Sequence, residues 1–415
     1  MDNTKVSREN NIISVVGSLY DFRRLLSEVH KSIMNAGYTD IELNFSQCTA
    51  AFQSSMLGIC AQILKYTYDG ITFNLILPEL PSLKNLFINT NWAHLIDSKK
   101  YLPSTFRGHT RIPATQYNNP DEQQRAVNKI ANTILGAIPD IKREDFAAFE
   151  WSINEITDNV LVHSNSPIGG LVQISTFQRK RKQVEFAVAD AGLSIPKTLR
   201  DGRPEITSDT AALDQAIREG VTRDRAVGQG NGLFGTYQVC SQSKGLFEVN
   251  SRYGKLFYTE SNGLHVAIES IPYTGTLVNA IIDFSVPHLL ENSLRFGGKK
   301  YSPVDFIEHQ YETNQNGEVI LKLANESQSF GSRISGTPIR IKIKNMIQMG
   351  TINKIFVDLE GVPLVSSSFA DEVFAKLFLE IGPIDFMSKI SLINTMDTVK
   401  KLIDKSITQR ASTGM

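Results

Sequence analysis

Four polar residues share one side of an otherwise apolar helix. In the stretch FEWSINEITDNVLVHS, residues 149–164, a helical period places Glu155, Asp158, Asn159 and His163 on one stripe. Carboxylates, amides and imidazoles are the side chains that accept protons and hydrogen bonds or bind cations. The stripe therefore predicts a site for polar chemistry beside a packed core.

Two glycine-bearing loops, VADAGLSIP (188–196) and VGQGNGLFG (227–235), follow this helix along the chain. Each is expected where a strand or loop meets a helix. Glycines without side chains let backbone amides approach an anion closely and allow positive φ, so the second loop predicts phosphate binding. The loop is not a P-loop, because GxxxxGK[ST] is absent, and the HRD and DFG motifs of protein kinases are absent as well. The glycines of the second loop are Gly228, Gly230, Gly232 and Gly235.

Together, the helix and the two loops resemble the N, G1 and G2 boxes of the GHKL ATPase superfamily, which includes gyrase, heat-shock-chaperone, histidine-kinase and mismatch-repair ATPases. The order and spacing of the three motifs match those of the superfamily. The resemblance implies ATP and Mg²⁺ as cofactors and a Bergerat-type sandwich of helices on a mixed sheet. The matching motifs are ExxxN (Glu155, Asn159), DxGxS (Asp190, Gly192, Ser194) and GxGxGL (Gly228 to Leu233).

The resemblance implies a role for each matching residue. Asn159 would bind Mg²⁺ through its amide oxygen, and Glu155 would be the general base that orients water or a hydroxyl toward the γ-phosphate. Asp190 would accept a hydrogen bond from the adenine amino group, and Gly192 would let the base lie close to the backbone. Ser194 stands where a third glycine is usual, so the turn there must tolerate a side chain. The other cofactor-binding residues would be Gly228, Gly230, Gly232, Leu233, Thr276 and His163.

Several polar residues near these motifs have two interpretations. His163 is either part of the nucleotide site or a helix-end histidine stabilised by the helix dipole. Asp158 is either functional or a solvated neighbour. Residues 197–227 would form the nucleotide lid, in which Arg223 and Arg225 either contact phosphate or belong to a solvated charged loop.

The carboxyl-terminal part resembles a second family. Residues 351–410 are similar to STAS-like domains in the strand FVDLEGV, the run SSSFADE and the late Arg410, with GSR shortly before them. STAS domains have the fold of bacterial anti-anti-sigma factors, in which a GHKL serine kinase phosphorylates a serine at a helix start. The resemblance implies Ser367 or Ser368 as a phosphoacceptor.

An internal repeat points to a second, more diverged STAS-like copy. Without a gap, residues 41–64 lie over 355–378 and pair Asn44 with Asp358. Ser54, which pairs with Ser368, is therefore a third candidate phosphoacceptor.

Other features of these helix starts favour different roles. A serine such as Ser367 or Ser54 can simply cap the open amino terminus of a helix. Phe369 replaces the glycine that is usual in STAS domains, and Asp371 and Glu372 in the first turn would oppose a phosphate.

The chain length and the order of predicted elements indicate three α/β parts, within the α/β (α+β) class. With 415 residues the chain is too long for one ordinary core. We predict a diverged STAS-like domain at 1–98, a GHKL ATP-binding domain at 99–290 and a STAS-like domain at 299–415. The polar, proline-bearing segment RGHTRIPATQYNNPDEQQ is expected to mark the first boundary.

Composition excludes several classes of protein. The 43 basic and 43 acidic residues balance, so no global charge favours nucleic acid, and QRKRKQ (178–183) is more simply a hairpin turn. Cys48, Cys60 and Cys240 show no CxxC spacing, which argues against a disulfide framework and a zinc site. No segment approaches the roughly 20 apolar residues needed to span a bilayer, so we expect a soluble cytoplasmic protein.

Two functions remain open at this point. The chain could be an anti-sigma-type serine kinase that acts on its own STAS-like parts or on a partner. Alternatively, it could be an ATP-gated switch or assembly protein, in which nucleotide orders the lid and the STAS-like parts bind a protein partner or a second copy.

Overall fold

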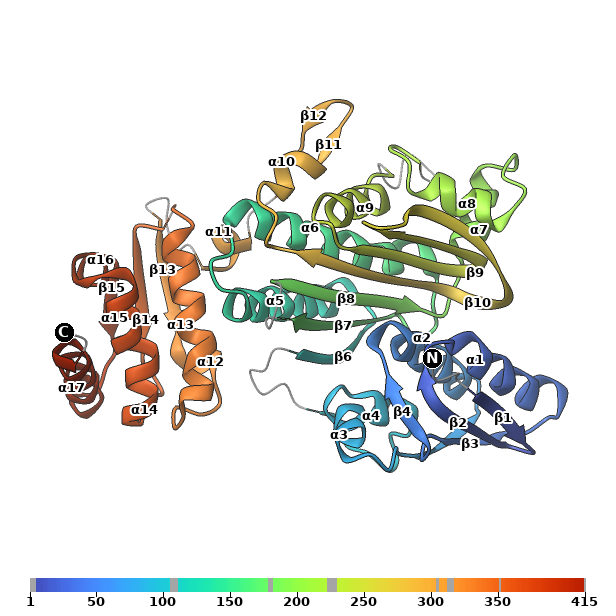
Figure 1. Cartoon of the computed structure of the whole chain (residues 1–415), viewed down its shortest axis with the longest axis horizontal. Helices are drawn as coiled ribbons and strands as arrows, with labels where there is room; N and C mark the ends of the chain where they lie inside the picture. Colours follow the sequence, from blue (N-terminus) through green and yellow to red (C-terminus); the bar gives the residue numbers. More distant parts are fainter. Residues whose placement is uncertain are drawn as a thin grey trace.

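The computed structural model describes residues 5–104, 111–177, 182–221, 230–303, 306–311, 317–350 and 352–413. The elements of these residues form three units that follow one another along the chain, as the colours of Figure 1 show. Each unit combines one sheet with helices, which confirms the predicted mixed α/β architecture.

The first unit is built on a mixed sheet of order β1-β2-β3-β5, with β4 paired to β2. β1 is antiparallel to β2 and the other pairings are parallel. The elements are β1 (Lys5–Glu9), β2 (Ile12–Leu19), α1 (Phe22–His30), its π-helical continuation η1 (Lys31–Asn35), β3 (Asp40–Asn44), β4 (Cys48–Ala51), α2 (Gln53–Tyr68), β5 (Thr72–Ile76), α3 (Pro81–Asn89) and α4 (Trp92–Ile96).

The second unit has a five-stranded sheet of order β6-β7-β8-β10-β9, and all four pairings are antiparallel. Helices α5, α6 and α9 lie on one face of it (Figure 1). The elements are β6 (Arg111–Tyr117), α5 (Pro120–Ala137), α6 (Arg143–Asn159), the π-helical turn η2 (Val160–Ser164), β7 (Gly170–Phe177), β8 (Gln183–Asp190), α7 (Ile195–Gly202), α8 (Asp209–Ala216), α9 (Gly232–Gln242), β9 (Leu246–Thr259) and β10 (Gly263–Asp283).

Both faces of this sheet are buried, and strand alternation divides its residues between them. Phe186 and Val188 of β8 pack into the core under helices α5 and α6. Ala187 and Ala189 point the other way and pack into the core of the first unit. This explains why VEFAVAD is apolar almost throughout.

Helix α2 of the first unit covers the back of the sheet. Its residues 55–63 are all buried, so the helix lacks a solvent-exposed stripe over that length. Polar side chains complete the contact: Gln53 Nε2 donates to the Gln173 carbonyl at 3.3 Å, and Trp92 Nε1 donates to Gln173 Oε1 at 2.8 Å. Arg23, which is 4 % exposed, donates to the carbonyls of Arg252 and Gly254 in β9. The first two units therefore share a core.

The third unit is a parallel sheet of order β13-β14-β15 with helices around it. A short connection leads into it from the second unit. The connecting elements are α10 (Leu289–Ser293), β11 (Arg295–Phe296), β12 (Lys299–Lys300) and α11 (Phe306–Tyr311). The unit itself contains β13 (Glu318–Lys322), α12 (Leu323–Glu326), α13 (Arg333–Gln348), β14 (Lys354–Asp358), α14 (Ser367–Ala370), its π-helical continuation η3 (Asp371–Ala375), α15 (Lys376–Ile381), α16 (Pro383–Lys389), β15 (Ile390–Ile393) and α17 (Asp397–Thr413).

Helix α13 docks the third unit onto α5. Gly136 of α5 allows the close approach, because a Cβ atom there would lie 2.9 Å from the Pro338 carbonyl oxygen. Asn345, which is fully buried, donates from Nδ2 to the carbonyls of Leu135 and Ile138 and accepts from Asp140 N at 2.8 Å. It thereby satisfies backbone groups at the carboxyl end of α5 that have no partner within the helix.

Some elements differ from the sequence expectations. RIPATQY, within the segment expected to mark a boundary, forms the edge strand β6, and α5 starts at Pro120. β10 is a long strand that includes Thr276, so this residue does not precede the last strand. Local propensity did not indicate either feature, because strand pairing with β7 and β9 creates them.

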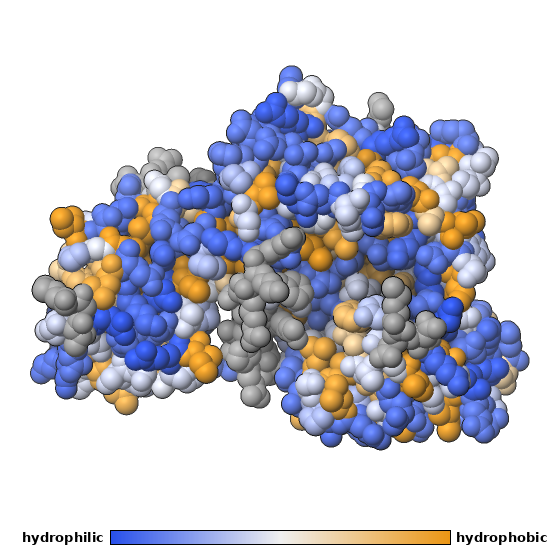
Figure 2. Space-filling model, viewed as in Figure 1, coloured by the Kyte–Doolittle hydropathy of each residue, from blue (hydrophilic) through white to orange (hydrophobic). Residues whose placement is uncertain are grey.

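On the face shown in Figure 2, the hydrophobic residues that the structure describes lie in small groups among hydrophilic ones. None of the helices within the described residues combines the length and apolar character needed to cross a membrane.

Candidate functional site

The polar stripe of α6 and η2 opens into a cavity of about 400 Å³. The cavity lies between α6, the helices α7 to α9, the end of β8 and the interior of β10 around Thr276 and Val278. The helix changes from α to π geometry directly after Asn159, a change that often marks functional sites. Of the predicted site residues, those that line the cavity are Glu155, Asp158, Asn159, His163, Asp190, Gly230, Gly232, Leu233 and Thr276.

Glu155 lies against the start of α9. A Cβ atom on Gly232 would come 2.5 Å from Glu155 Oε2, so a larger residue there would displace the carboxyl group. Burial, together with the charge of Asp158, raises the pKa of Glu155 to about 7. A carboxylate with such a pKa can take up a proton from a reacting group near neutral pH.

Asp190 is the last residue of β8, lines the same cavity and is 2 % exposed. Burial raises its pKa to about 7, against hydrogen bonds from the backbone amides of Gly192 and Thr276. The Gly192 N–H donates to Asp190 Oδ1 at 2.8 Å. The carboxyl group is therefore held in one orientation, with acceptor capacity left for a ligand.

The structure gives a different reason for the residue type at each of three loop positions, Gly192, Gly230 and Ser194. A Cβ atom on Gly192 would lie 2.1 Å from the Ser164 carbonyl oxygen, so this glycine lets the turn after β8 pack against the end of η2. Gly230 has a φ of +72° and closely faces Val221. Ser194 has an extended backbone and caps α7 by accepting from Lys197 N, so its position does not require glycine.

Gly192 and Ser194 are near the cavity without lining it, and three predicted residues cannot be placed. Gly228 and the lid arginines Arg223 and Arg225 lie outside the described residues. His163 is partly buried in η2 and lines the cavity. Burial raises the pKa of Asp158, and the charge of His163 opposes this shift. Both interpretations of these two residues are compatible with that position.

An aromatic side of the cavity was not expected from the sequence. Trp151 of α6, Phe296 of β11 and Tyr301 line it together, with ring centroids 5.6 to 6.0 Å apart. The latter two rings belong to RFGGKKY, which has no periodic apolar pattern. Their only sequence signal is their aromatic type within a polar segment at the boundary of the second and third predicted domains.

The described part of the chain contains no group of three or more His, Cys, Asp or Glu side chains that could hold a metal ion. A protein site made of carboxylates is thus absent from these residues. The donor set of the cavity instead fits a cation that receives one amide oxygen from Asn159 and the rest from a ligand or water, as Mg²⁺ often does.

The candidate phosphoacceptors occupy the first turns of two helices. Ser366, not Ser367, caps α14: its Oγ accepts from Phe369 N at 3.0 Å. Ser367 and Ser368 are exposed. Ser54 is partly buried in the first turn of α2, whose N-cap residue makes no side-chain cap. The capping role considered for Ser367 and Ser54 is therefore wrong.

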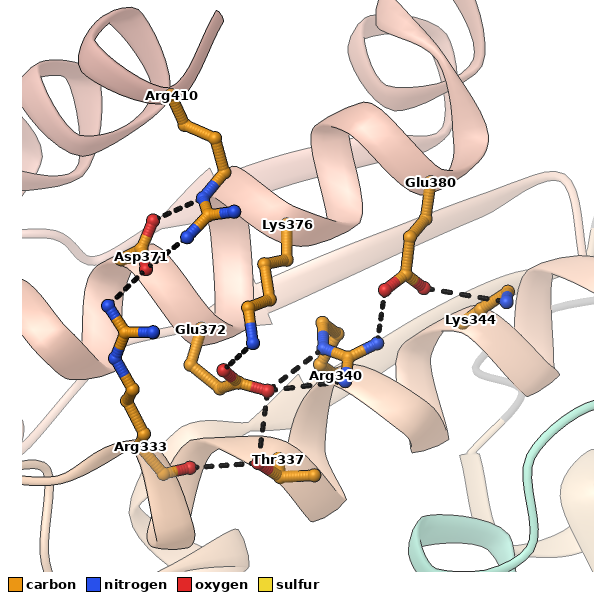
Figure 3. Close-up of polar contacts among 9 residues, drawn as sticks. All are labelled: Arg333, Thr337, Arg340, Lys344, Asp371, Glu372, Lys376, Glu380 and Arg410. Carbon is orange, nitrogen blue, oxygen red and sulfur yellow. Dashed lines mark hydrogen bonds and ion pairs between the residues drawn. The ribbon is translucent and has the colours of Figure 1, made fainter. Parts of the chain in front are cut away.

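A network of ion pairs connects α13 with the helix that follows these serines (Figure 3). Asp371 receives hydrogen bonds from Arg410 at 2.5 and 2.7 Å and pairs with Arg333 at 2.9 Å. The arginine pair holds the pKa of Asp371 below its usual range. The sequence motifs GSR, SSSFADE and the late arginine thus meet in space.

The two halves of the internal repeat share a local contact. The Ser46 N–H donates to Asn44 Oδ1 at 2.9 Å, and the Glu360 N–H donates to Asp358 Oδ1 at 2.9 Å. In both units this turn follows a central strand of the sheet, and the next helix has serines in its first turn. The ungapped alignment therefore pairs residues with the same structural position.

Neither candidate phosphoacceptor site lies beside Glu155. Ser54 lies in the first turn of α2, which packs on the back of the sheet, whereas the cavity is on the front. Ser367 and Ser368 begin α14 in the third unit, at the other end of the molecule from α7, α8 and α9 (Figure 1).

One comparison with known proteins gives a match. Residues 335–400 match the family described as "STAS-like domain of unknown function (DUF4325)", which supports the STAS-like interpretation of that segment. No curated protein and no solved structure matches the chain.

Proposed function

We propose that this chain is a Mg·ATP-binding signalling protein of the GHKL superfamily, and that the cavity in its second unit is the nucleotide site. The observation that carries the proposal is the meeting of Glu155, Asn159 and Asp190 around one cavity bordered by Gly230 and Gly232. These residues come from three separate sequence motifs. The layering of helices on one face of the sheet also supports a Bergerat-type ATPase, although the described strands of this sheet are all antiparallel and not mixed as expected.

Each of these residues would contact a different part of the bound Mg·ATP. Asp190 would accept a hydrogen bond from the adenine amino group, while Asn159 would contribute an oxygen ligand to Mg²⁺. Bound Mg²⁺ would neutralise charge on the phosphates. Glu155 would orient water or a hydroxyl and take its proton, for which a pKa of about 7 is suitable.

We favour phosphoryl transfer to a serine of another molecule as the reaction, with a STAS-like unit as the acceptor. Ser367 and Ser368 are exposed and follow the position of STAS phosphoacceptors. Because they lie far from the cavity along the same chain, the acceptor would belong to a second copy or a protein partner.

A specific observation also favours the alternative of an ATP-gated switch. The third unit is fixed to α5 by buried contacts, and α5 is bonded to α6 where Gln123 Nε2 donates to Thr157 Oγ1 at 2.7 Å. Thr157 lies between Glu155 and Asn159 on α6. A change at the cavity would therefore reach the STAS-like unit through packed helices.

Calorimetric titration of the full chain with Mg·ATP tests the binding proposal. Saturable binding that disappears in Asp190→Asn is the expected result. If the wild-type chain does not bind Mg·ATP, or if Asp190→Asn binds it equally well, the superfamily assignment is wrong.

A mixing experiment separates the kinase from the switch. A Ser367→Ala/Ser368→Ala variant serves as the enzyme, and a Glu155→Ala variant with intact serines serves as the acceptor. A phosphate-sized mass gain on the Glu155→Ala chain supports transfer between molecules. An unchanged mass in a mixture of two folded, ATP-binding variants excludes transfer between copies of the chain. It leaves the switch, or a kinase that acts on a protein partner, as the function, and ADP formation then measures turnover without an acceptor.

A further inference from the structure

The short segment 273–276 of β10 runs between the first unit and Asp190. Tyr273 in this segment is 1 % exposed, and its hydroxyl donates to the Asp190 carbonyl oxygen at 3.0 Å. Two positions later, Gly275 has a φ of +87° and lies so close that a Cβ atom would come 2.5 Å from the same oxygen. The carbonyl group of Asp190 is therefore fixed by the Tyr273 hydroxyl and by the backbone of Gly275.

Residues of the first unit hold Tyr273 in turn. Gly58 of α2 faces the tyrosine ring, because a Cβ atom there would lie 3.4 Å from Tyr273 Cε2. The Phe22 ring packs edge-on against it, with centroids 5.8 Å apart. Gln62 of α2 donates from Nε2 to the Thr274 carbonyl at 2.6 Å. Helices α1 and α2 thus fix both the ring and the next peptide group.

The same segment reaches the carboxyl group of Asp190. The backbone amide of Thr276 is hydrogen-bonded to this carboxyl group, on the cavity side of the sheet. Ser251 Oγ donates to the Gly275 carbonyl at 2.8 Å and keeps the turn in place. A continuous series of contacts therefore links α2 to the Asp190 carboxyl group, which is proposed to bind the adenine amino group.

We propose that Tyr273 is a positioning residue for Asp190, and that through it the first unit sets the base selectivity of the nucleotide site. This inference rests on the proposed nucleotide function. A hydrogen bond to the carbonyl of Asp190 fixes the peptide plane, and the peptide plane fixes the direction of the Cα–Cβ bond. Directional recognition of an amino group fails when the acceptor rotates by a few tens of degrees.

Tyr273→Phe tests the inference, because it removes the hydroxyl and keeps the ring. The measurement is the dissociation constant of Mg·ATP and of Mg·ITP, in which an oxygen replaces the adenine amino group. We expect Tyr273→Phe to weaken ATP binding about fivefold, the usual effect of one lost hydrogen bond, and to leave ITP binding nearly unchanged. The ratio of the two constants then moves toward one.

A matched control comes from the neighbouring strand. Tyr258 of β9 donates its hydroxyl to the Ser241 carbonyl at 3.5 Å, away from Asp190, so Tyr258→Phe should keep the wild-type ratio. A folded Tyr273→Phe chain with the wild-type ratio would overturn the inference while leaving ATP binding intact. A wild-type chain that binds neither nucleotide would overturn the proposed function itself.

A second variant covers the case in which Tyr273→Phe does not fold. Gln62→Met keeps the side-chain volume of α2 and removes the donor to the Thr274 carbonyl. We expect it to lower the ATP preference in the same direction, although Gln62 does not line the cavity. Unchanged preference in this variant counts against control by the first unit.

Discussion

Replacement of Glu155 by glutamine should stabilise the nucleotide-free protein at neutral pH and remove its turnover. The pKa of the Glu155 carboxyl rises from its ordinary value of 4.5 to about 7 in the folded chain, through burial and the charge of Asp158. At about 1.4 kcal/mol per pH unit this difference gives about 3 kcal/mol as an upper bound. Because the side chain is partly exposed, solvent screening reduces the expected gain to about 2 kcal/mol.

The direction of the pH effect follows from proton binding. Between pH 4.5 and about 7 the folded chain binds more protons at Glu155 than the unfolded chain does, so this group's contribution to stability falls as pH rises. The gain from Glu155→Gln should be near zero at pH 4.5 and reach its full value by pH 8. Urea unfolding at several pH values measures it.

A neighbouring variant provides the control. Asp158→Asn removes the charge that raises the pKa of Glu155, and should give a smaller gain within the same pH window. Turnover should fall by about 10² to 10⁴ in Glu155→Gln, the usual contribution of a general base, with ATP affinity little changed. A stability gain of equal size at pH 5 and pH 8 would refute the assignment of a raised pKa to Glu155.

Three further changes test other parts of the structure. Asp190→Asn should stabilise the nucleotide-free chain increasingly as pH rises from 3.8 toward 7, because the buried carboxyl group no longer ionises. A difference in the free energy of unfolding in urea that stays constant across that range would contradict this. Lys342→Ala leaves the partly buried Glu326 without its partner at 2.7 Å and should cost about 3 kcal/mol, whereas the double variant Lys342→Met/Glu326→Gln should cost less in the same assay. Gly235→Ala places a Cβ atom 2.3 Å from the Trp151 ring and should cost about 2 kcal/mol, and an unchanged thermal midpoint would argue against this contact.

The sequence could indicate the local parts of the site but not all of its surroundings. Glu155 and Asn159 share a helix face because of the helical period, and their position beside a cavity agrees with that pattern. That Asp190 lies across from them was expected only from the resemblance to a family. No spacing rule predicts which loop approaches which helix across a sheet.

Other features depend on packing between distant segments. The apolar run of α2 indicates a buried helix. Its pattern does not indicate that the helix packs against the sheet of the second unit. Three serines in a row lie at the start of α14, and which one caps the helix depends on a one-residue difference in where it begins. Ser366 became the cap because its backbone is extended and its Oγ meets the Phe369 amide.

The shared core of the first two units affects how the chain folds. Leu171 and Leu277 of the central sheet are fully buried in the core that surrounds α2. A fragment that starts near residue 99 would expose these side chains, and one that ends there would expose α2. Residues 5–283 should therefore unfold in a single cooperative transition, although their sequence is divided between two predicted domains.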